Sequence, residues 1–164
     1  ACEPTSGTGL HIHVGTRYGR PSVDAELLYR FLTKNQERVE KLSGRCSGSM
    51  WSYSEFGEGH KYSCLGLNHR NTIEFRVFRS TRNLWRLRYR LQFVDALVNA
   101  AMTWEGREDV PTYDEFAREL DAEKYPDLVR FNAEKFGIQT PEYVRQETLF
   151  DVDEVEEGSV CALS

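Results

Sequence analysis

The chain has 164 residues, of which 40% are hydrophobic and 29% are charged. This length and composition predict one folded domain with a hydrophobic core, and no apolar run approaches a membrane span. The formal net charge is -5, but it is unevenly placed: 17 acidic and 6 basic residues lie from Glu105 onward, which leaves the first part of the chain positive. The overall acidic balance, with no recognisable nucleic-acid-binding motif, argues against nucleic acid as a partner.

The first predicted element is a strand, GLHIHVG, at residues 9 to 15. Successive side chains of a strand point to opposite faces. His11 and His13 therefore share one face, while the opposite face carries Leu10, Ile12 and Val14. The pattern predicts a sheet with one buried face and two imidazoles on the other.

A helix is expected next, from Ser22 as the capping residue to Gly44. Its apolar residues recur at helical spacing and predict one buried stripe. Residues 45 to 61 are rich in Ser and Gly but also contain Met50, Trp51 and other aromatic residues. We interpret them as an ordered loop over a site, because this stretch is too aromatic for a disordered linker.

Two further strands are predicted at residues 62 to 68 and 72 to 78, joined as a hairpin through the turn at 68 to 71. In the second of them, Ile73, Phe75 and Val77 alternate with polar residues. Glu74 and Arg76 therefore share the polar face. If this strand and the histidine strand belong to one sheet, both histidines, the carboxylate and the guanidinium converge. Imidazole and carboxylate groups can hold a divalent cation, and arginine provides a fixed fork for phosphate or carboxylate oxygens.

The long helix that follows is expected from the cap Asn83 to about Trp104. Its predicted core face consists of Leu84, Leu87, Leu91, Val94, Leu97 or Val98, and Ala101. Arginine recurs on it at positions 86, 88 and 90, and we expect these three side chains on a solvated face.

The C-terminal part is predicted to be helical and acidic. Thr112 and Glu115 have capping-box spacing for a helix ending near Lys124, residues 126 to 136 form a helix stopped at Gly137, and a last helix covers 141 to about 148. The predicted fold class is therefore α+β, with an antiparallel sheet packed against helices. We expect one domain over 1 to 150, divided into a site-bearing part (1 to 104) and an acidic helical part (105 to 150), followed by an acidic tail at 151 to 164.

The four cysteines, at positions 2, 46, 64 and 161, show neither metal-site spacing nor a regular disulfide framework. They are expected to be reduced thiols, and no secretory leader is recognisable, so the sequence favours the cytoplasm.

Two motifs together resemble a known family. GTGLHIHVG, followed downstream by NHRNTIEFRVFRSTRNLWRLRYRLQFVDALVNAA, resembles the amidoligases of the glutamine synthetase and glutamate-cysteine ligase superfamily. The shared pattern is Gly-x-His-x-His on one strand, then Glu-x-Arg on a later strand that leads into a long helix. The match covers roughly residues 5 to 104, the later half of the family's catalytic domain.

The resemblance implies an enzyme that uses ATP to phosphorylate a carboxylate and lets an amine displace the phosphate to form an amide. By position, His11 and Glu74 would be ligands of Mg2+ or Mn2+, and His13 would face the nucleotide phosphates. Arg76 would hold the transferred phosphoryl group or the acyl phosphate. Arg45, just after the first helix, is a looser match as a substrate or phosphate contact.

One part of the family's pattern is missing from the sequence. Amidoligases usually open with a half-domain whose Gly-x-Glu-x-Glu strand supplies further metal carboxylates, and the nearest string here, Phe56 to His60, has only one. Either a second polypeptide supplies this half and completes the site around carboxylate and amine substrates, or the N-terminal half was removed, or the chain has lost catalysis.

Two alternatives to the ligase stay open. The chain could be a non-catalytic binding or structural module that retains the fold and uses its arginines against an acidic partner. It could also be a metal hydrolase or a cupin-like protein built on His11 and His13, with His60, Cys64 or His69. The glutamate that a cupin carries shortly after its His-x-His motif is absent.

Overall fold

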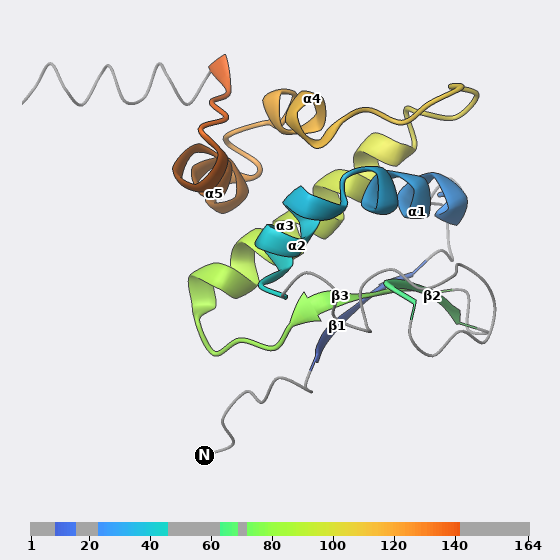
Figure 1. The fold of residues 1–164 in the computed structure, drawn as a ribbon, viewed down its shortest axis with the longest axis horizontal. Helices are drawn as coiled ribbons and strands as arrows, with labels where there is room; N and C mark the ends of the chain where they lie inside the picture. The colour runs from blue at the N-terminus through green and yellow to red at the C-terminus, as the bar shows by residue number, and fades with distance from the viewer. Residues whose placement is uncertain (1–8, 16–22, 46–62, 69–71, 142–164) are drawn as a thin grey trace, which may run out of the picture.

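The structure is a computed structural model that describes residues 9–15, 23–45, 63–68 and 72–141. In chain order its elements are β1 (Gly9–Gly15), α1 (Ala25–Lys34), α2 (Gln36–Ser43), β2 (Leu65–Asn68), β3 (Thr72–Arg79), α3 (Leu84–Ala101), α4 (Tyr113–Arg118) and α5 (Pro126–Phe136) (Figure 1). The predicted loop at 46 to 61, the helix beyond Pro141 and the acidic tail lie outside the described residues.

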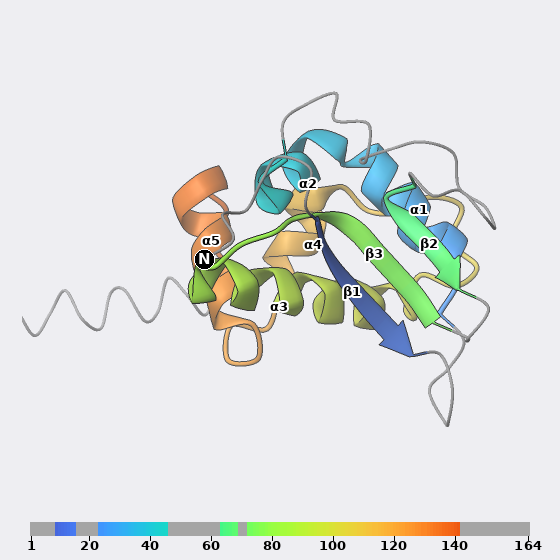
Figure 2. The ribbon, with the colours of Figure 1, turned by 90° about the horizontal axis from the view of Figure 1, so that it is seen from below.

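The sheet has three antiparallel strands in the order β1-β3-β2, so the strand with Glu74 and Arg76 is central (Figure 2). Phe75 pairs with Ile12 of β1 on one side and with Leu65 of β2 on the other. The helices lie on one side of the sheet (Figure 1). This arrangement confirms an α+β fold with a small antiparallel sheet.

A β-bulge interrupts the pairing of β1 with β3. Leu10 pairs with Phe78 but Ile12 pairs with Phe75, so Arg76 and Val77 together oppose the single residue His11. The extra residue changes the phase of β3. As a result Phe78 as well as Val77 is buried, and its ring packs edge-on against Phe93 at a centroid distance of 6.3 Å. Simple alternation could not predict this, since it assigned only Val77 to the apolar set.

The single helix expected from Ser22 to Gly44 is in fact two helices that meet at Asn35. Asn35 is buried, its amide donates to the carbonyls of Phe31 and Pro111, and its side-chain oxygen accepts from the backbone N–H of Tyr113. These bonds to a distant loop compensate for the helix break. The capping residue is Asp24, which accepts from the N–H of Glu26, and the C-terminal end at Gly44, with φ of 73°, is as predicted.

The long helix α3 begins at the predicted cap, where Asn83 accepts from the backbone N–H of Arg86. Its predicted core face is wrong at Leu84 and Leu91, which are 60% and 45% exposed, and Leu87 is only half-buried. The helix packs against α5 as well as α1. Its buried face is therefore wider than the predicted one and is rotated relative to it. The buried side chains are Tyr89, Arg90, Phe93, Val94, Ala96, Leu97, Val98 and Ala101.

Arg90 is therefore not on a solvated face, unlike the exposed Arg86 and Arg88. Its guanidinium donates to the carbonyls of Leu42 and Arg79, at 3.4 and 2.5 Å. These bonds join the ends of α2 and β3 to α3 and satisfy two backbone carbonyls. Such partners are what make a buried guanidinium tolerable.

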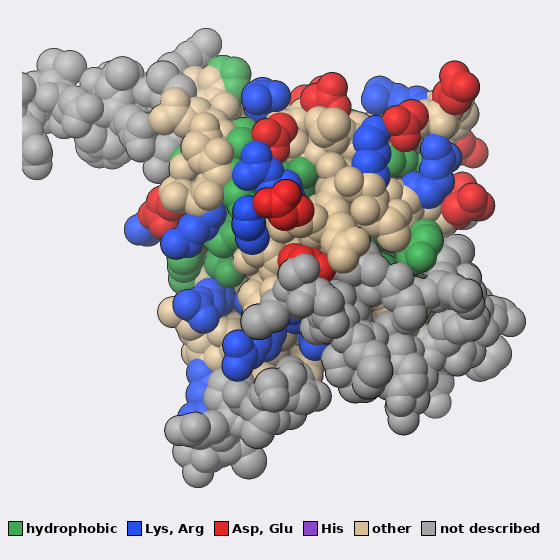
Figure 3. All heavy atoms as spheres, in the orientation of Figure 1, with side chains coloured by type: hydrophobic (Ala, Val, Ile, Leu, Met, Phe, Trp, Pro, Cys, Tyr) green, Lys and Arg blue, Asp and Glu red, His purple; other side chains and the backbone are tan. Residues whose placement is uncertain are grey.

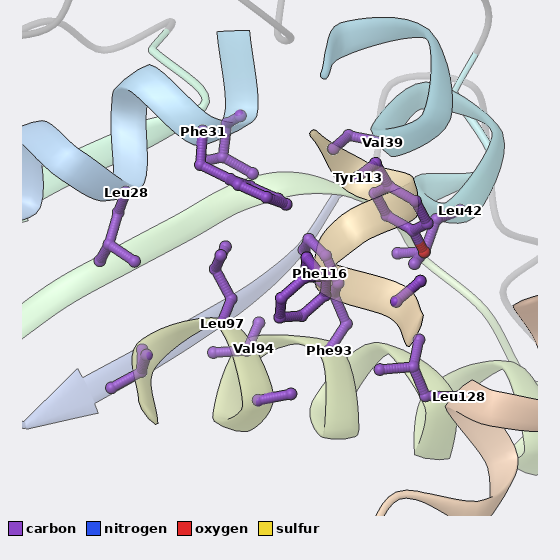
Figure 4. Packing of buried hydrophobic residues seen from close by; sticks show 14 of the residues in the cluster. Leu28, Phe31, Val39, Leu42, Phe93, Val94, Leu97, Tyr113, Phe116 and Leu128 are labelled. Carbon is purple, nitrogen blue, oxygen red and sulfur yellow. The ribbon is translucent and has the colours of Figure 1, made fainter. Parts of the chain in front are cut away.

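The C-terminal helices follow the predicted start and stop signals with one exception. Thr112 and Glu115 form the capping box of α4, but α4 ends at Arg118, well before Lys124. Helix α5 ends at Gly137, with φ of 66°, as predicted. Aromatic rings fill the core between α4, α5, α1 and α3. The ring centroids of Phe31 and Phe116, for example, lie 5.2 Å apart (Figure 4).

Candidate functional site

Figure 2 shows the sheet from the side that points away from the helices. Four polar side chains of the sheet converge, through contacts centred on Glu74. His11 and His13 come from β1, and Glu74 and Arg76 come from β3. His13 is the direct cross-strand partner of Glu74, and His11 lies opposite the bulge formed by Arg76 and Val77. We call these four residues the polar cluster.

Glu74 is the centre of the polar cluster. One of its oxygens, Oε1, lies 2.7 Å from His11 Nδ1 and 3.6 Å from His13 Nε2. The other, Oε2, accepts from Arg76 Nη2 at 2.6 Å. The side chain of Glu74 is only 7% exposed, whereas those of His11 and His13 are 46% and 48% exposed. The cluster thus has a buried anionic centre and two accessible imidazoles.

The electrostatics of the polar cluster favour an ionised Glu74. Burial by itself raises the pKa of this carboxyl. The hydrogen bond and charge of Arg76, with smaller contributions from His11 and His13, outweigh burial and hold the pKa of Glu74 below its ordinary value. The carboxylate is therefore negative at neutral pH.

Two glycines shape the polar face: Gly9, which opens the Gly-x-His-x-His motif, and Gly66, which the sequence does not single out. Gly66 of β2 pairs with Glu74, and a Cβ at Gly66 would lie 3.1 Å from the guanidinium carbon of Arg76. A Cβ at Gly9 would lie 3.2 Å from His11 Nε2 and 2.8 Å from Arg45 Nη2. A glycine inside a strand is the signal that could have identified Gly66, because it often marks a close approach.

Arg45 borders the polar cluster but is not bonded to it. Its Nε donates to the carbonyl of Val77 at 2.9 Å and its Nη2 to that of Phe78 at 3.1 Å. Burial, followed by the charge of Arg79, lowers the pKa of Arg45, which still leaves an arginine charged. Arg45 thus supports the bulged end of β3 and places a positive charge beside His11.

The polar cluster fits a divalent cation only in part. Among the described residues, no group of three or more His, Cys, Asp and Glu side chains is arranged to hold a metal ion. Mg2+ prefers octahedral oxygen coordination, and the one carboxylate of the cluster already contacts His11 and Arg76 through both its oxygens. The carboxylate of Glu74 is a ligand type that suits Mg2+ or Mn2+, whereas the imidazoles of His11 and His13 suit transition metals better, and the three side chains do not close a coordination shell.

A pocket of about 450 Å³ adjoins the polar cluster along the outer edge of β1. Residues 12 to 15 line it from the strand, and Leu91, Val94, Asp95 and Val98 line it from α3. Within the part of the chain that the structure describes, β1 pairs with β3 alone. The other edge of β1 therefore presents backbone groups next to an apolar recess.

Comparison with known proteins gave no match: no family model, no curated protein and no solved structure is similar to the chain. In the described ranges, none of the helices combines the length and the apolar character needed to cross a membrane.

Proposed function

We propose that this chain is the later half of the catalytic domain of an ATP-dependent carboxylate-amine ligase, on a sheet of the glutamine synthetase type. The observation that carries the proposal is the polar cluster, in which two imidazoles, a carboxylate and a guanidinium lie on one sheet face while helices cover the other. The resemblance of the two sequence motifs gives this cluster its chemical interpretation.

The reaction would proceed in two steps. A carboxylate oxygen of the substrate attacks the γ-phosphorus of ATP, the bond to ADP breaks, and an acyl phosphate forms. The amine then attacks the acyl carbon, and phosphate leaves with the electron pair of the broken bond. Phosphoryl transfer of this kind depends mainly on positioning and charge neutralisation.

Each residue of the polar cluster has a role in this proposal. Arg76 holds the transferred phosphoryl group, His13 orients the nucleotide phosphates, and Glu74 and His11 contribute to binding Mg2+ or Mn2+. The divalent ion, when bound, supplies charge neutralisation for the phosphates. Arg45 adds positive potential beside His11. In the free chain Glu74 keeps Arg76 in place, and binding would exchange part of this ion pair for contacts with the nucleotide.

A second polypeptide or an N-terminal half would complete the site. We propose that its strand pairs with the outer edge of β1 and covers the recess between β1 and α3. That strand would bring the carboxylates absent from the polar cluster. The proposal places the assembly in the cytoplasm, where ATP is abundant and a thiol such as the buried, free Cys64 stays reduced.

A non-catalytic module is the second candidate, and one observation favours it. Both oxygens of Glu74 are engaged within the chain, so its carboxylate is satisfied without a ligand. A structural ion-pair network would look the same. The two candidates differ in whether the cluster binds nucleotide.

Calorimetry separates these candidates without requiring turnover. The chain is titrated with ATP in the presence of Mg2+, and separately with Mg2+ alone. The ligase proposal predicts weak binding of the metal and tighter binding of the metal-nucleotide complex. Arg76→Lys, which loses the bidentate fork, should weaken nucleotide binding by at least about tenfold, and Glu74→Gln should remove the dependence on Mg2+.

The controls are Arg107→Lys and Glu105→Gln, which make the same changes at exposed positions. Both control variants should bind ATP with Mg2+ as tightly as the unchanged chain does. If ATP does not bind, or if it binds equally well to Arg76→Lys and Glu74→Gln, the ligase proposal is wrong and the structural network is the better account.

A further inference from the structure

A second pocket, of about 360 Å³, lies in the helical layer among the C-terminal end of α2, the first turns of α3, and α5. Its floor is aromatic. Tyr89 and Phe131 are buried and stack at a centroid distance of 4.3 Å, and the half-buried Trp85 packs edge-on against Tyr89 at 5.2 Å. Phe136 extends the wall, 5.5 Å from Phe131. This pocket is built by other elements than the polar cluster.

The rim of the aromatic pocket is positively charged. Lys41, Arg86, Arg90 and Lys135 line it, against the single carboxylate of Glu134. Glu134 accepts from Arg130 at 2.7 Å, and Lys41 pairs with Glu37 at the same distance. Among the described residues, Arg86 and Lys135 form no ion pair with a carboxylate. Two exposed cations thus face the pocket without a counter-charge.

The first turn of α3 adds to this positive potential. It contains no acidic residue, although the N-terminal end of a helix favours negative charge, and it places Arg86 there instead. Burial is the main cause that lowers the pKa of Arg90; Tyr89 opposes it, and the charges of Arg86 and Arg45 add smaller contributions that lower the pKa. Cations that raise one another's energy in this way are stabilised by a bound anion.

Trp85, which lines the same pocket, also carries a buried donor. The indole N–H of Trp85 is shielded from solvent and has no hydrogen-bond acceptor among the described residues. Buried polar groups are nearly always bonded, so this donor lacks the partner that such a group usually has, while its burial keeps it out of reach of a ligand in the pocket. Figure 3 shows apolar side chains between α5 and the start of α3, with Lys and Arg side chains around them.

We propose that the aromatic pocket binds a small organic anion with a flat apolar ring, such as an aryl phosphate or an aryl carboxylate. The ring packs against Trp85 and Phe136, and the anionic group lies between Arg86 and Lys135. Ring and charge are both required: the aromatic floor offers little to an inorganic ion, and two flexible exposed cations alone hold an anion weakly in water.

The test is a nuclear magnetic resonance titration of the full chain that follows the indole N–H signal of Trp85, assigned with Trp85→Phe. Three probes divide the ligand into its parts: phenyl phosphate, inorganic phosphate and benzyl alcohol. Phenyl phosphate should shift the signal in a saturable way, with a Kd at least about tenfold lower than that of either part. The variant Arg86→Gln/Lys135→Gln should raise the Kd for phenyl phosphate about tenfold.

The matched control is Arg107→Gln/Arg118→Gln, which also removes two exposed positive charges but lies outside the pocket. It should bind phenyl phosphate as the unchanged chain does. The proposal is overturned if phenyl phosphate causes no saturable shift or if the two double variants weaken it equally. It is also overturned if either part alone binds as tightly as the whole probe. ATP also combines a flat ring with phosphates, so the two proposals are separated by their variants: ATP binding at the polar cluster is weakened by Arg76→Lys, and binding in the aromatic pocket by Arg86→Gln/Lys135→Gln.

Discussion

Replacing Phe75 by alanine tests whether the apolar face of β3 holds this fold together. Phe75 is fully buried and is paired with strands on both sides, through Ile12 and Leu65. The change removes a phenyl ring from the sheet's central strand and leaves a cavity that the flanking strands cannot easily fill. Large-to-small changes of this kind cost about 3–5 kcal/mol, a large part of the roughly 5–15 kcal/mol available to a domain.

The neighbouring change Glu74→Gln provides the comparison on the opposite face. Glutamine keeps the shape and can still accept from Arg76, but the charge-assisted contacts with Arg76 and His11 are lost. Weakening the hydrogen bonds of a buried polar group lowers the free energy of unfolding by about 1–3 kcal/mol. Glu74→Gln should therefore remain folded and lose less stability than Phe75→Ala.

Urea unfolding followed by far-ultraviolet circular dichroism measures both free energies of unfolding. The slope of the free energy with urea should be similar for both variants, so that the change in midpoint reports stability. Two results would refute this reasoning. If Glu74→Gln costs as much as Phe75→Ala, the polar cluster is a structural network rather than a binding site. If Phe75→Ala costs less than about 1 kcal/mol, the burial of this face does not hold the sheet.

Three further predictions follow from the same contacts. Arg90→Ala should cost about 1–3 kcal/mol in urea unfolding because it leaves buried carbonyls without donors, whereas the exposed Arg88→Ala should stay within about 0.5 kcal/mol of the unchanged chain. The pKa of Glu74 is held below its ordinary value of 4.5, so the stabilisation by its carboxylate is present above pH 4.5 and is lost as pH falls through the folded-state pKa. The difference in unfolding free energy between the unchanged chain and Glu74→Gln should therefore shrink over this acidic range. A difference that stays constant with pH would contradict the assignment. By light scattering after size-exclusion chromatography, the chain alone should self-associate through the edge of β1 that no described strand covers, and a soluble monomer would contradict the proposed partner strand.

The elements that the sequence predicts best are those with strong local signals. Both ends of α5, the cap of α3 at Asn83 and the Gly44 terminus of α2 depend on residues within one turn of the boundary. The strands with His11 and Glu74 were predictable because their alternation has a clear period. Their convergence on one face followed from assuming a shared sheet.

The features that escaped prediction depend on distant contacts. Asn35 breaks the first helix through bonds to Pro111 and Tyr113, more than 70 positions away. The bulge opposite His11 comes from the register between two strands, and Leu84 is exposed because of how α3 packs. None of these leaves a local signature. Likewise, the buried position of Arg90 depends on carbonyls of α2 and β3.

The most direct test of the account asks where a metal-nucleotide complex binds. Mn2+ is paramagnetic, so Mn2+ with a non-hydrolysable ATP analogue broadens the resonances of nearby protons. The account predicts that the imidazole resonances of His11 and His13 broaden strongly at low Mn2+ concentration, and that Glu74→Gln abolishes this effect. Undiminished broadening in Glu74→Gln, or sharp His11 and His13 resonances while other signals broaden, would contradict the claim that the polar cluster is the nucleotide site.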